Sequence, residues 1–250
     1  MKNRFVLIAI TLLFFTGCST LYKAKVILPP SWIDMKEIAP NVYANIDMNT
    51  TQQQKLLTQI PQAKEYVKDV WDVVTSDPVI YACSTNECAK SLGIGARAHQ
   101  VLNHIVLSTK ALNKELISHE WSHAELYKRV GGFWNQKEIP TWFNEGLAVL
   151  VSHEIRHDER AWKKIVDKNI KHPSINELIT MKQWHSATKK YNKDIDAKDI
   201  VVTYATAGHI VKEWYDKVGS EGLAYLINEV KNGASFDEIY NKTLERNSLP

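Results

Sequence analysis

The sequence predicts an α+β fold in which a small mixed β-sheet packs against a helical bundle. Apolar residues recur at helical spacing from residue 51 to 75 and over much of the chain beyond residue 110. Two short runs of strand-forming residues, Pro78–Ala82 and Val101–Leu107, lie between these helical parts. With 250 residues, 44% of them hydrophobic, the chain can bury one sizeable core, so a single folded domain is expected.

The first 17 residues have the features of a secretory signal peptide. Lys2 and Arg4 precede the apolar run Phe5–Phe15, which is too short for an ordinary transmembrane helix. The run ends in Phe15-Thr16-Gly17-Cys18, which resembles the bacterial lipoprotein cleavage box. This resemblance implies cleavage before Cys18 and a lipid on its sulfur, and Ser19 implies sorting to the outer membrane. An uncleaved or plainly secreted form is the alternative, because Phe15 stands where an aliphatic residue is usual.

Residues 18–45 are expected to be a lipid-anchored tether that leads into a domain of residues 46–250. That domain would lie in the periplasm or at the surface of the bacterial cell envelope. Loss of Lys2 and Arg4 lowers the 31 basic residues to 29, against 28 acidic residues. This balance gives no electrostatic basis for binding nucleic acid. The expected partners are therefore the membrane, through the lipid anchor, and a substrate.

Two cysteines remain once Cys18 carries a lipid. Cys83 and Cys88 flank Ser84-Thr85-Asn86-Glu87, a turn-like insert, in a compartment that is oxidising. A small disulfide that closes this loop is expected, and a pair of buried free thiols is the alternative.

A long helix is expected over Lys110–Val130, with Ser108 or Thr109 as its N-cap and Gly131-Gly132 as its end. It contains the pentad His119-Glu120-Trp121-Ser122-His123. At about 3.6 residues per turn, the two histidines lie on one face and can reach a single metal ion, while Glu120 falls beside it. The alternative is an amphipathic helix with two core histidines, but burying them without partners is costly and a shared metal removes that cost.

A second helix, opening near Pro140, carries Glu145, which lies 22 positions after His123. Glu145 shares a face with Trp142 and Ala148, so its carboxylate is expected to point inward, where it needs a partner. A solvated glutamate is the alternative. With Glu145 as third ligand, the group becomes a site for one Zn²⁺ per chain with one open coordination position. Gly146 and Ala148 are small enough for this helix to pack closely on the first.

The two segments H-E-W-S-H and W-F-N-E-G-L-A resemble the gluzincin metallopeptidases, which include minigluzincins, M1 aminopeptidases and thermolysin-like enzymes. The resemblance extends over roughly residues 50–245 in element order and is tight only around Glu120 and Glu145. It implies a zincin-like α+β fold, with the sheet packed on the active-site helix and a C-terminal helical bundle. It also implies zinc-dependent hydrolysis of peptide bonds, with His119, His123 and Glu145 as zinc ligands and Glu120 as general base.

An extended peptide or protein substrate is expected to pair with the edge strand near Val101–Leu107, in a cleft between that strand and the motif helix. Endopeptidase activity is favoured over aminopeptidase activity. M1 aminopeptidases hold the free amine with a glutamate in a G-A-M-E-N segment, and Gly95-Ala96-Arg97-Ala98-His99 lacks that carboxylate. A non-catalytic zinc- or peptide-binding envelope lipoprotein is a further alternative, although such a protein would not need Glu120.

Tyr204 is the candidate for a second catalytic side chain, because a tyrosine hydroxyl can donate a hydrogen bond to the oxyanion formed during hydrolysis. The segment Val202–Gly208 resembles the M1 segment in which a tyrosine precedes two small residues. A core tyrosine is the alternative, and His209 is the reserve donor. Surface or strand positions are expected for four histidines that share no ligand spacing with the pentad: His99, His104, His153 and His157.

The remaining chain is predicted to be largely helical. Ser174 with Glu177 and Ser235 with Glu238 match the capping box and mark two helix starts. Thr188–Asp199 is polar and is expected to be a surface connection, and Tyr204–Lys217 and Glu221–Lys231 are expected to be paired C-terminal helices.

Overall fold

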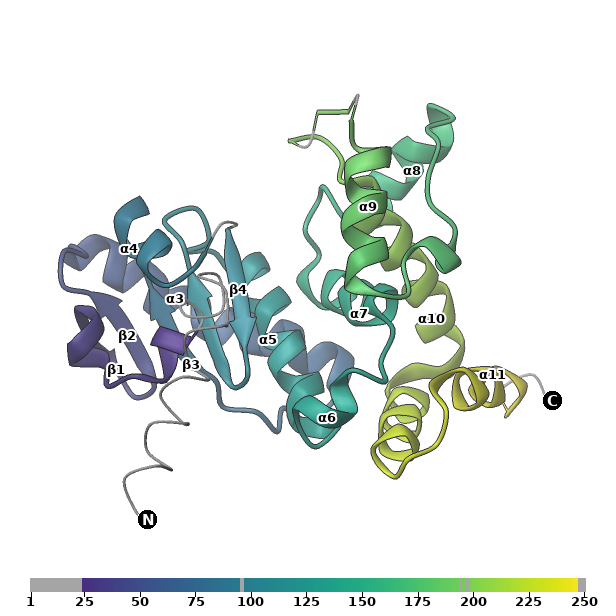
Figure 1. Cartoon of the computed structure of the whole chain (residues 1–250), viewed down its shortest axis with the longest axis horizontal. Coiled ribbons are helices and arrows are strands. Elements are labelled where there is room, and N and C mark those ends of the chain that lie inside the picture. Colours follow the sequence, from purple (N-terminus) through teal and green to yellow (C-terminus); the bar gives the residue numbers. More distant parts are fainter. Residues whose placement is uncertain (1–23, 95–96, 194, 197, 247–250) are drawn as a thin grey trace, which may run out of the picture.

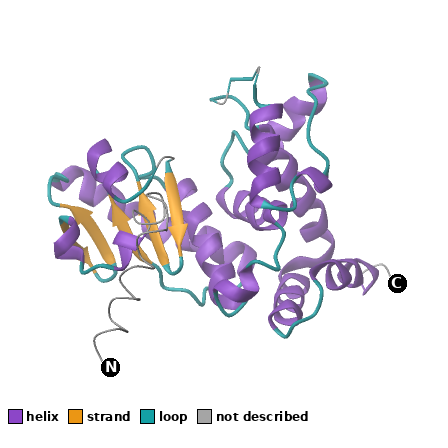
Figure 2. Cartoon of the chain, viewed as in Figure 1, coloured by secondary structure: helices purple, strands orange, loops and turns teal. Residues whose placement is uncertain are grey.

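Figure 1 shows the computed structural model of the chain, which describes residues 24–94, 97–193, 195–196 and 198–246. These residues form nine α-helices and a five-stranded mixed sheet, which confirms the α+β class and the helical C-terminal region. The sheet and the C-terminal helices occupy two halves of the molecule (Figure 2). The predicted signal peptide and Cys18 lie outside the described residues. Within the described part, no helix combines the length and apolar character that crossing a membrane requires.

The sheet has the strand order β1-β2-β3-β5-β4. The three inner strands, β2 (Val42–Asn45), β3 (Val79–Ala82) and β5 (His104–Leu107), run parallel to one another. The two outer strands, β1 (Met35–Ala39) and β4 (Ala98–Val101), run antiparallel to their neighbours. The run from residue 78 to 82 matches β3. β1 and β2 lie within residues 18–45, where the sequence predicts a tether and no strand, so the folded part begins earlier than expected.

The predicted strand Val101–Leu107 is instead part of a hairpin. β4 ends at Val101, β5 begins at His104, and the turn between them places Leu102 at φ 55°. Two-residue hairpin turns of this kind usually carry asparagine or glycine at positive φ, so leucine at the first turn position gives no warning of the reversal. The edge strand beside the motif helix is therefore β4, and β5 lies inside the sheet.

Alternating residues of the sheet face two separate cores, as the period of a strand requires. One face, represented by Ile80 and Ile105, packs on α3 (Thr50–Trp71) and on the motif helix. The other, represented by Tyr81 and Val106, packs on α4 (Asn86–Ser91) and on the 3₁₀ helix η1 (Ala24–Ile27). A second 3₁₀ helix, η2 (Pro30–Ile33), leads into β1.

The motif helix, α5 (Lys114–Arg129), starts later than the sequence predicts. Asn113 is the N-cap, and its side-chain oxygen accepts a hydrogen bond from the Leu116 backbone N–H at 3.0 Å. The proposed cap Ser108 instead accepts a hydrogen bond from the Lys110 N–H in a turn before the helix. The helix ends at the predicted point, where Val130 is the C-cap and Gly131 adopts φ 86°.

A buried carboxylate fixes α5 against the segment between α3 and β3. Glu125 is fully buried and accepts hydrogen bonds from the backbone and hydroxyl groups of Thr75 and Ser76, at 2.6–3.0 Å. The Arg129 guanidinium pairs with the same carboxylate at 2.6 Å. This connection sets the position of the helix that carries the pentad.

Helices make up the second half of the molecule. After α6 (Phe133–Gln136) come α7 (Thr141–Ser152), α8 (Glu159–Asp167), the 3₁₀ helix η3 (Ile175–Glu177), α9 (Met181–Tyr191), α10 (Val202–Lys231) and α11 (Phe236–Arg246). The capping box at Ser174 is present but opens only η3, whereas α11 starts directly after Ser235. α9 includes the first residues of the predicted connection from Thr188 to Asp199. α10 is non-helical at Gly219, φ 63°, so its two parts correspond to the predicted pair of helices.

α7 lies between α5 and α10 and packs most closely on α10. A Cβ atom on Gly146 would lie 2.4 Å from the Ala207 carbonyl oxygen, and one on Gly208 would lie 2.4 Å from Val149 Cγ1. Gly146 therefore serves the contact between α7 and α10, not the predicted contact between α7 and α5. This close approach brings the start of α10 beside the part of α7 that carries Glu145.

Candidate metal centre

His119, His123 and Glu145 meet where α5 and α7 pack together. All three side chains are buried, and their ligand atoms lie within 4.8 Å of one another. Glu145 Oε2 is 3.5 Å from His119 Nε2 and 3.7 Å from His123 Nε2. The structure thus brings together the three residues that the sequence proposes as ligands.

The arrangement fits a metal ion. Glu145 Oε2 is buried, yet no hydrogen bond of good geometry reaches it from the described residues. Metal–ligand distances of about 2.1 Å in tetrahedral geometry place ligand atoms roughly 3.4 Å apart, close to the separations of the Glu145 oxygen from the two histidine nitrogens. Burial alone would raise the pKa of Glu145, but His123 and His119 hold it below its usual value, so the carboxylate is ionised. The group could therefore hold a cation.

Asn144 orients one of the two histidines. Its Oδ1 lies 2.8 Å from His123 Nδ1, so in the neutral ring Nδ1–H donates to Asn144. Nε2 then carries the lone pair, and it is this nitrogen that lies 3.7 Å from Glu145. Asn144 stands in the motif around Glu145, but the sequence assigned it no role. Its position on α7 couples the two ligand helices.

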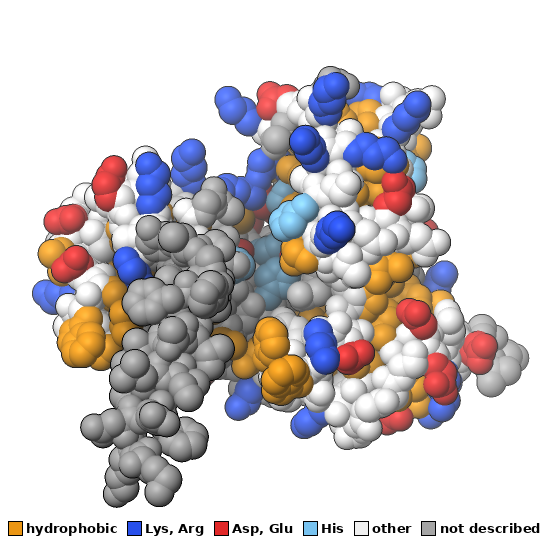
Figure 3. All heavy atoms as spheres, viewed as in Figure 1, with side chains coloured by type: hydrophobic (Ala, Val, Ile, Leu, Met, Phe, Trp, Pro, Cys, Tyr) orange, Lys and Arg blue, Asp and Glu red, His pale blue; other side chains and the backbone are white. Residues whose placement is uncertain are grey.

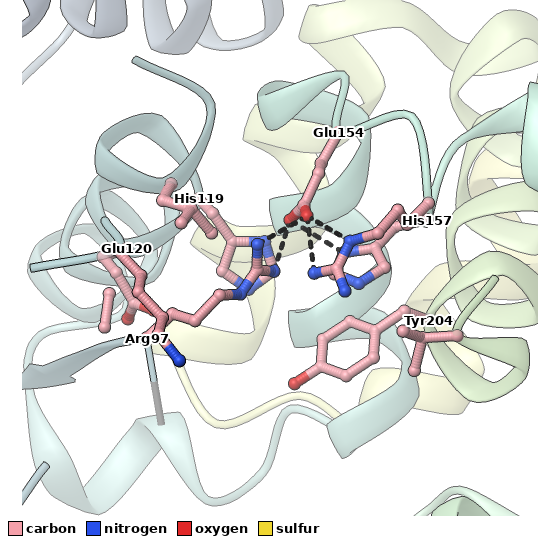
Figure 4. Close-up of a pocket in the computed structure, with 11 residues that line it drawn as sticks. Arg97, His119, Glu120, Glu154, His157 and Tyr204 are labelled. Carbon is pink, nitrogen blue, oxygen red and sulfur yellow. Dashed lines mark hydrogen bonds and ion pairs between the residues drawn. The ribbon is translucent and has the colours of Figure 1, made fainter. Parts of the chain in front are cut away.

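Glu120 lines a cavity of about 380 Å³ beside the cluster, together with His119. Its carboxyl group is buried, and burial raises its pKa to about 7. The nearby charge of Glu145 acts in the same direction, whereas His123 opposes it. Figure 4 shows Glu120 and His119 on the same side of this cavity.

Tyr204 occupies the first turn of α10 and lines the same cavity. Its ring stacks on His157 at a centroid distance of 4.5 Å, meets Trp184 edge-on at 5.0 Å and lies 5.9 Å from His119. The charge of Glu145 and burial hold the pKa of the Tyr204 hydroxyl well above its usual value, so it stays protonated and can donate. In Figure 4 the hydroxyl points into the cavity.

A charged cluster that the sequence did not indicate completes the cavity wall. Glu154, just after α7, accepts two hydrogen bonds from Arg97, at 2.7 and 2.8 Å, and two from Arg156, at 2.9 and 2.7 Å. Burial would raise the pKa of Glu154, but these partners, Arg97 first, lower it to about 2. The bridge from Arg97 to Glu154 joins the sheet half to the helical half across the cavity (Figure 4).

His157 differs from its predicted place. It is buried in the loop between α7 and α8 and lines the cavity, whereas a surface or strand position was expected. Burial lowers its pKa to about 3, so the ring is neutral. Among the described residues the metal-binding group does not include it.

The other histidines lie elsewhere. His99 and His104 are in β4 and β5, and His153 is exposed at the end of α7, as predicted. The reserve donor His209 does not line the cavity; its ring stacks on Trp162 at 4.4 Å, and its Nδ1 lies 3.1 Å from Glu159 Oε1.

The cavity lies in the hollow between the two halves, where Figure 3 shows histidine side chains at the surface. Ala98, the first residue of the edge strand β4, and Arg97, which precedes it, form the sheet side of the cavity. The expected cleft beside the motif helix is therefore bordered by β4.

Cys83 and Cys88 form a disulfide, with their Cα atoms 5.5 Å apart. Thr85 caps α4 within this loop by accepting a hydrogen bond from the Cys88 N–H at 3.1 Å. The disulfide therefore joins the end of β3 to the first turns of α4, on the sheet face opposite α3.

Scans of the chain against protein-family models, curated proteins and solved structures found no match.

Proposed function

We propose that the protein is a zinc metallopeptidase of the gluzincin type that hydrolyses peptide bonds as an endopeptidase. The observation that carries this proposal is the convergence of His119, His123 and Glu145 beside a cavity into which Glu120 faces. A site that only binds metal needs the first three side chains. A buried carboxylate next to them, in a cavity with room for a substrate group, is what hydrolysis requires in addition.

Zinc is the metal that suits these ligands best. Two imidazole nitrogens and one carboxylate oxygen form the ligand set of a catalytic zinc site with three protein ligands. When bound there, zinc supplies a Lewis acid that polarises a carbonyl oxygen and lowers the pKa of water. Asn144 holds the His123 ring in the tautomer that presents Nε2 to the ion.

Glu120 is the proposed general base. Its carboxylate accepts a proton from the attacking water and later passes that proton to the amine of the leaving peptide. Its place one residue after His119 keeps it beside the ligand set and outside it, so the carboxylate remains available to exchange protons.

Tyr204 is the proposed oxyanion donor. As the peptide carbon becomes tetrahedral, negative charge develops on the carbonyl oxygen, and a hydroxyl donor in the cavity stabilises that charge. Its contacts with His157 and Trp184 restrict the ring to one orientation before substrate arrives.

The edge strand supports cleavage within a chain. Among the described residues β4 pairs with β5 alone, and Ala98 of β4 and the preceding Arg97 border the cavity. An extended substrate can add to such an edge through backbone hydrogen bonds, which position it without requiring a chain end. Attachment to the outer membrane through a lipid on Cys18 belongs to the same proposal and is supported by the apolar run before that residue.

A digest of an unfolded protein tests this function. Reduced and alkylated casein is incubated with the zinc-loaded wild type, with Glu120→Gln and with Glu138→Gln, a control at an exposed glutamate. Mass spectrometry is expected to find internal cuts with the wild type and the control. Glu120→Gln should keep its zinc but cleave about 10²–10⁴-fold more slowly, because an amide cannot accept the proton. Equal cleavage by Glu120→Gln would contradict the proposal, and trimming of single residues would indicate an aminopeptidase.

A further inference from the structure

Cationic side chains predominate in the cavity outside the metal cluster. Arg97, Lys110 and Arg156 line it, against two carboxylates, Glu120 and Glu154. The cations come from three separate segments, before β4, between β5 and α5, and between α7 and α8. The fold brings these three residues together, so the positive charge is concentrated in the cavity and does not belong to any single segment of the chain.

Glu154 compensates only part of this positive charge. Both of its oxygens already accept hydrogen bonds from Arg97, and one of them also accepts two from Arg156. One carboxylate shared by two guanidinium groups leaves an excess of positive charge. Lys110 is exposed and adds to that excess at the rim.

Arg97 retains the capacity to bind a further group. Two of its nitrogens each donate one hydrogen bond to Glu154, whereas a guanidinium group has five N–H donors. About a third of its side chain, 34%, is exposed. Figure 4 shows the guanidinium between Glu120 and Glu154, among the side chains that line the cavity. A substrate held along β4 would pass next to it.

We propose that this cavity binds a carboxylate of the substrate, so that the peptidase prefers peptides carrying an acidic side chain or a free C-terminal carboxylate close to the bond that is cut. This proposal rests on the proposed peptidase function and names its substrate class. Arginine recognises carboxylates through paired N–H donors, and lysine at the rim attracts them as a point charge.

The same charges argue against recognition of a free amine. An aminopeptidase needs a carboxylate available to the substrate ammonium group, and the carboxylate of Glu154 is already bound by two arginines. A substrate ammonium would also meet the repulsion of Arg97 and Lys110. The cleft thus selects for negative charge in its substrate.

Binding to a protein that cannot turn over tests this proposal. The zinc-loaded Glu120→Gln protein is titrated into fluorescein-labelled alanine hexapeptides with Glu, Gln or Lys at each of four central positions. Each peptide is made as the C-terminal acid and as the amide, so that an acidic side chain and a free C-terminus are separate arms. Lys110→Gln, Arg97→Gln and the control Lys128→Gln, an exposed lysine of α5 outside the cavity, are compared in the same background.

Two comparisons are made: Glu peptides against Gln peptides, and C-terminal acids against amides. In at least one of them the carboxylate peptide should bind about tenfold more tightly than its neutral counterpart, and the lysine peptides should bind most weakly. Lys110→Gln should lower this preference several-fold, while Lys128→Gln should retain it. Arg97→Gln should abolish it, with a thermal midpoint measured alongside to show that the protein is folded. Because Lys110 is exposed and takes no part in the ion pair between Arg97 and Glu154, its variant keeps the test valid if Arg97→Gln unfolds.

Equal binding of acidic and neutral peptides would overturn the proposal, as would a preference that Lys110→Gln leaves unchanged. Absence of binding by every peptide would overturn it too. The casein digest measures cleavage independently of these binding results. A failure of the proposed substrate preference is therefore distinguishable from a failure of the proposed peptidase function.

Discussion

Asn144 Oδ1 lies 2.8 Å from His123 Nδ1, so the residue that precedes one proposed ligand in sequence holds the ring of another. The contact connects α7 to α5 and selects the His123 tautomer. It makes the geometry of the metal centre depend on how the two helices pack, as well as on the pentad itself.

Asn144→Ala should weaken zinc binding by about 10–100-fold, because His123 loses the acceptor that fixes its ring. Zinc affinity is measured by competition with a fluorescent chelator. Asn144→Asp keeps an acceptor oxygen at the same position and should bind zinc at least as tightly as the wild type. An alanine variant with unchanged affinity would show that the contact has no part in metal binding.

Tyr204→Phe should lower kcat by about 10²–10³, the loss expected for one oxyanion donor, and should leave KM and zinc content nearly unchanged. The ring contacts with His157 and Trp184 do not require the hydroxyl, so the variant should fold. Tyr225→Phe, in the second part of α10, is the matched control and should retain wild-type kcat. Wild-type kcat in Tyr204→Phe would assign Tyr204 to packing alone.

Protonation of Glu154 should lower the free energy of unfolding of the protein in acid. Its pKa is about 2 in the folded protein, against an ordinary value of 4.5. A lowered pKa contributes stability that is fully present above about pH 4.5 and is lost as the pH falls toward 2. For this buried carboxylate the contribution is on the order of 3 kcal/mol.

The free energy of unfolding in urea, measured from pH 6 to pH 2.5, tests this contribution. Wild type should exceed Glu154→Gln by the larger amount at pH 6, and the difference should shrink as the pH falls. Glu138→Gln, at an exposed position, should show no such change. A difference that is independent of pH would mean that the Glu154 charge does not stabilise the fold.

Local geometry explains which parts of the site were predictable. The spacing of His119 and His123 depends only on the pitch of a helix, and the inward face of Glu145 follows from its apolar neighbours on α7. The predicted start of α5 was wrong because serine and asparagine are both good N-caps. In the structure Ser108 accepts a hydrogen bond within the turn before the helix, and Asn113 caps the helix. Sequence patterns thus locate the candidate ligands more accurately than the helix ends.

Contacts between distant segments explain what was missed. Arg97 and Glu154 are 57 positions apart, and no periodic pattern relates a residue before an edge strand to one after a helix. His157 follows a charged stretch that reads as surface, and its burial results from packing against α10. Asn144 could have been found, because a ligand histidine usually donates its second N–H to a nearby acceptor.

The metal content of the purified protein tests the central claim most directly. Elemental analysis after mild dialysis is made on the wild type, on His123→Ala and on His185→Ala, a control at an exposed histidine of α9. The proposed site predicts about one zinc ion per chain in the wild type and the control, and little or none in His123→Ala, because two protein ligands hold zinc weakly. Equal zinc in the wild type and His123→Ala, or no zinc in the wild type, would contradict the assignment of His119, His123 and Glu145 as a zinc site.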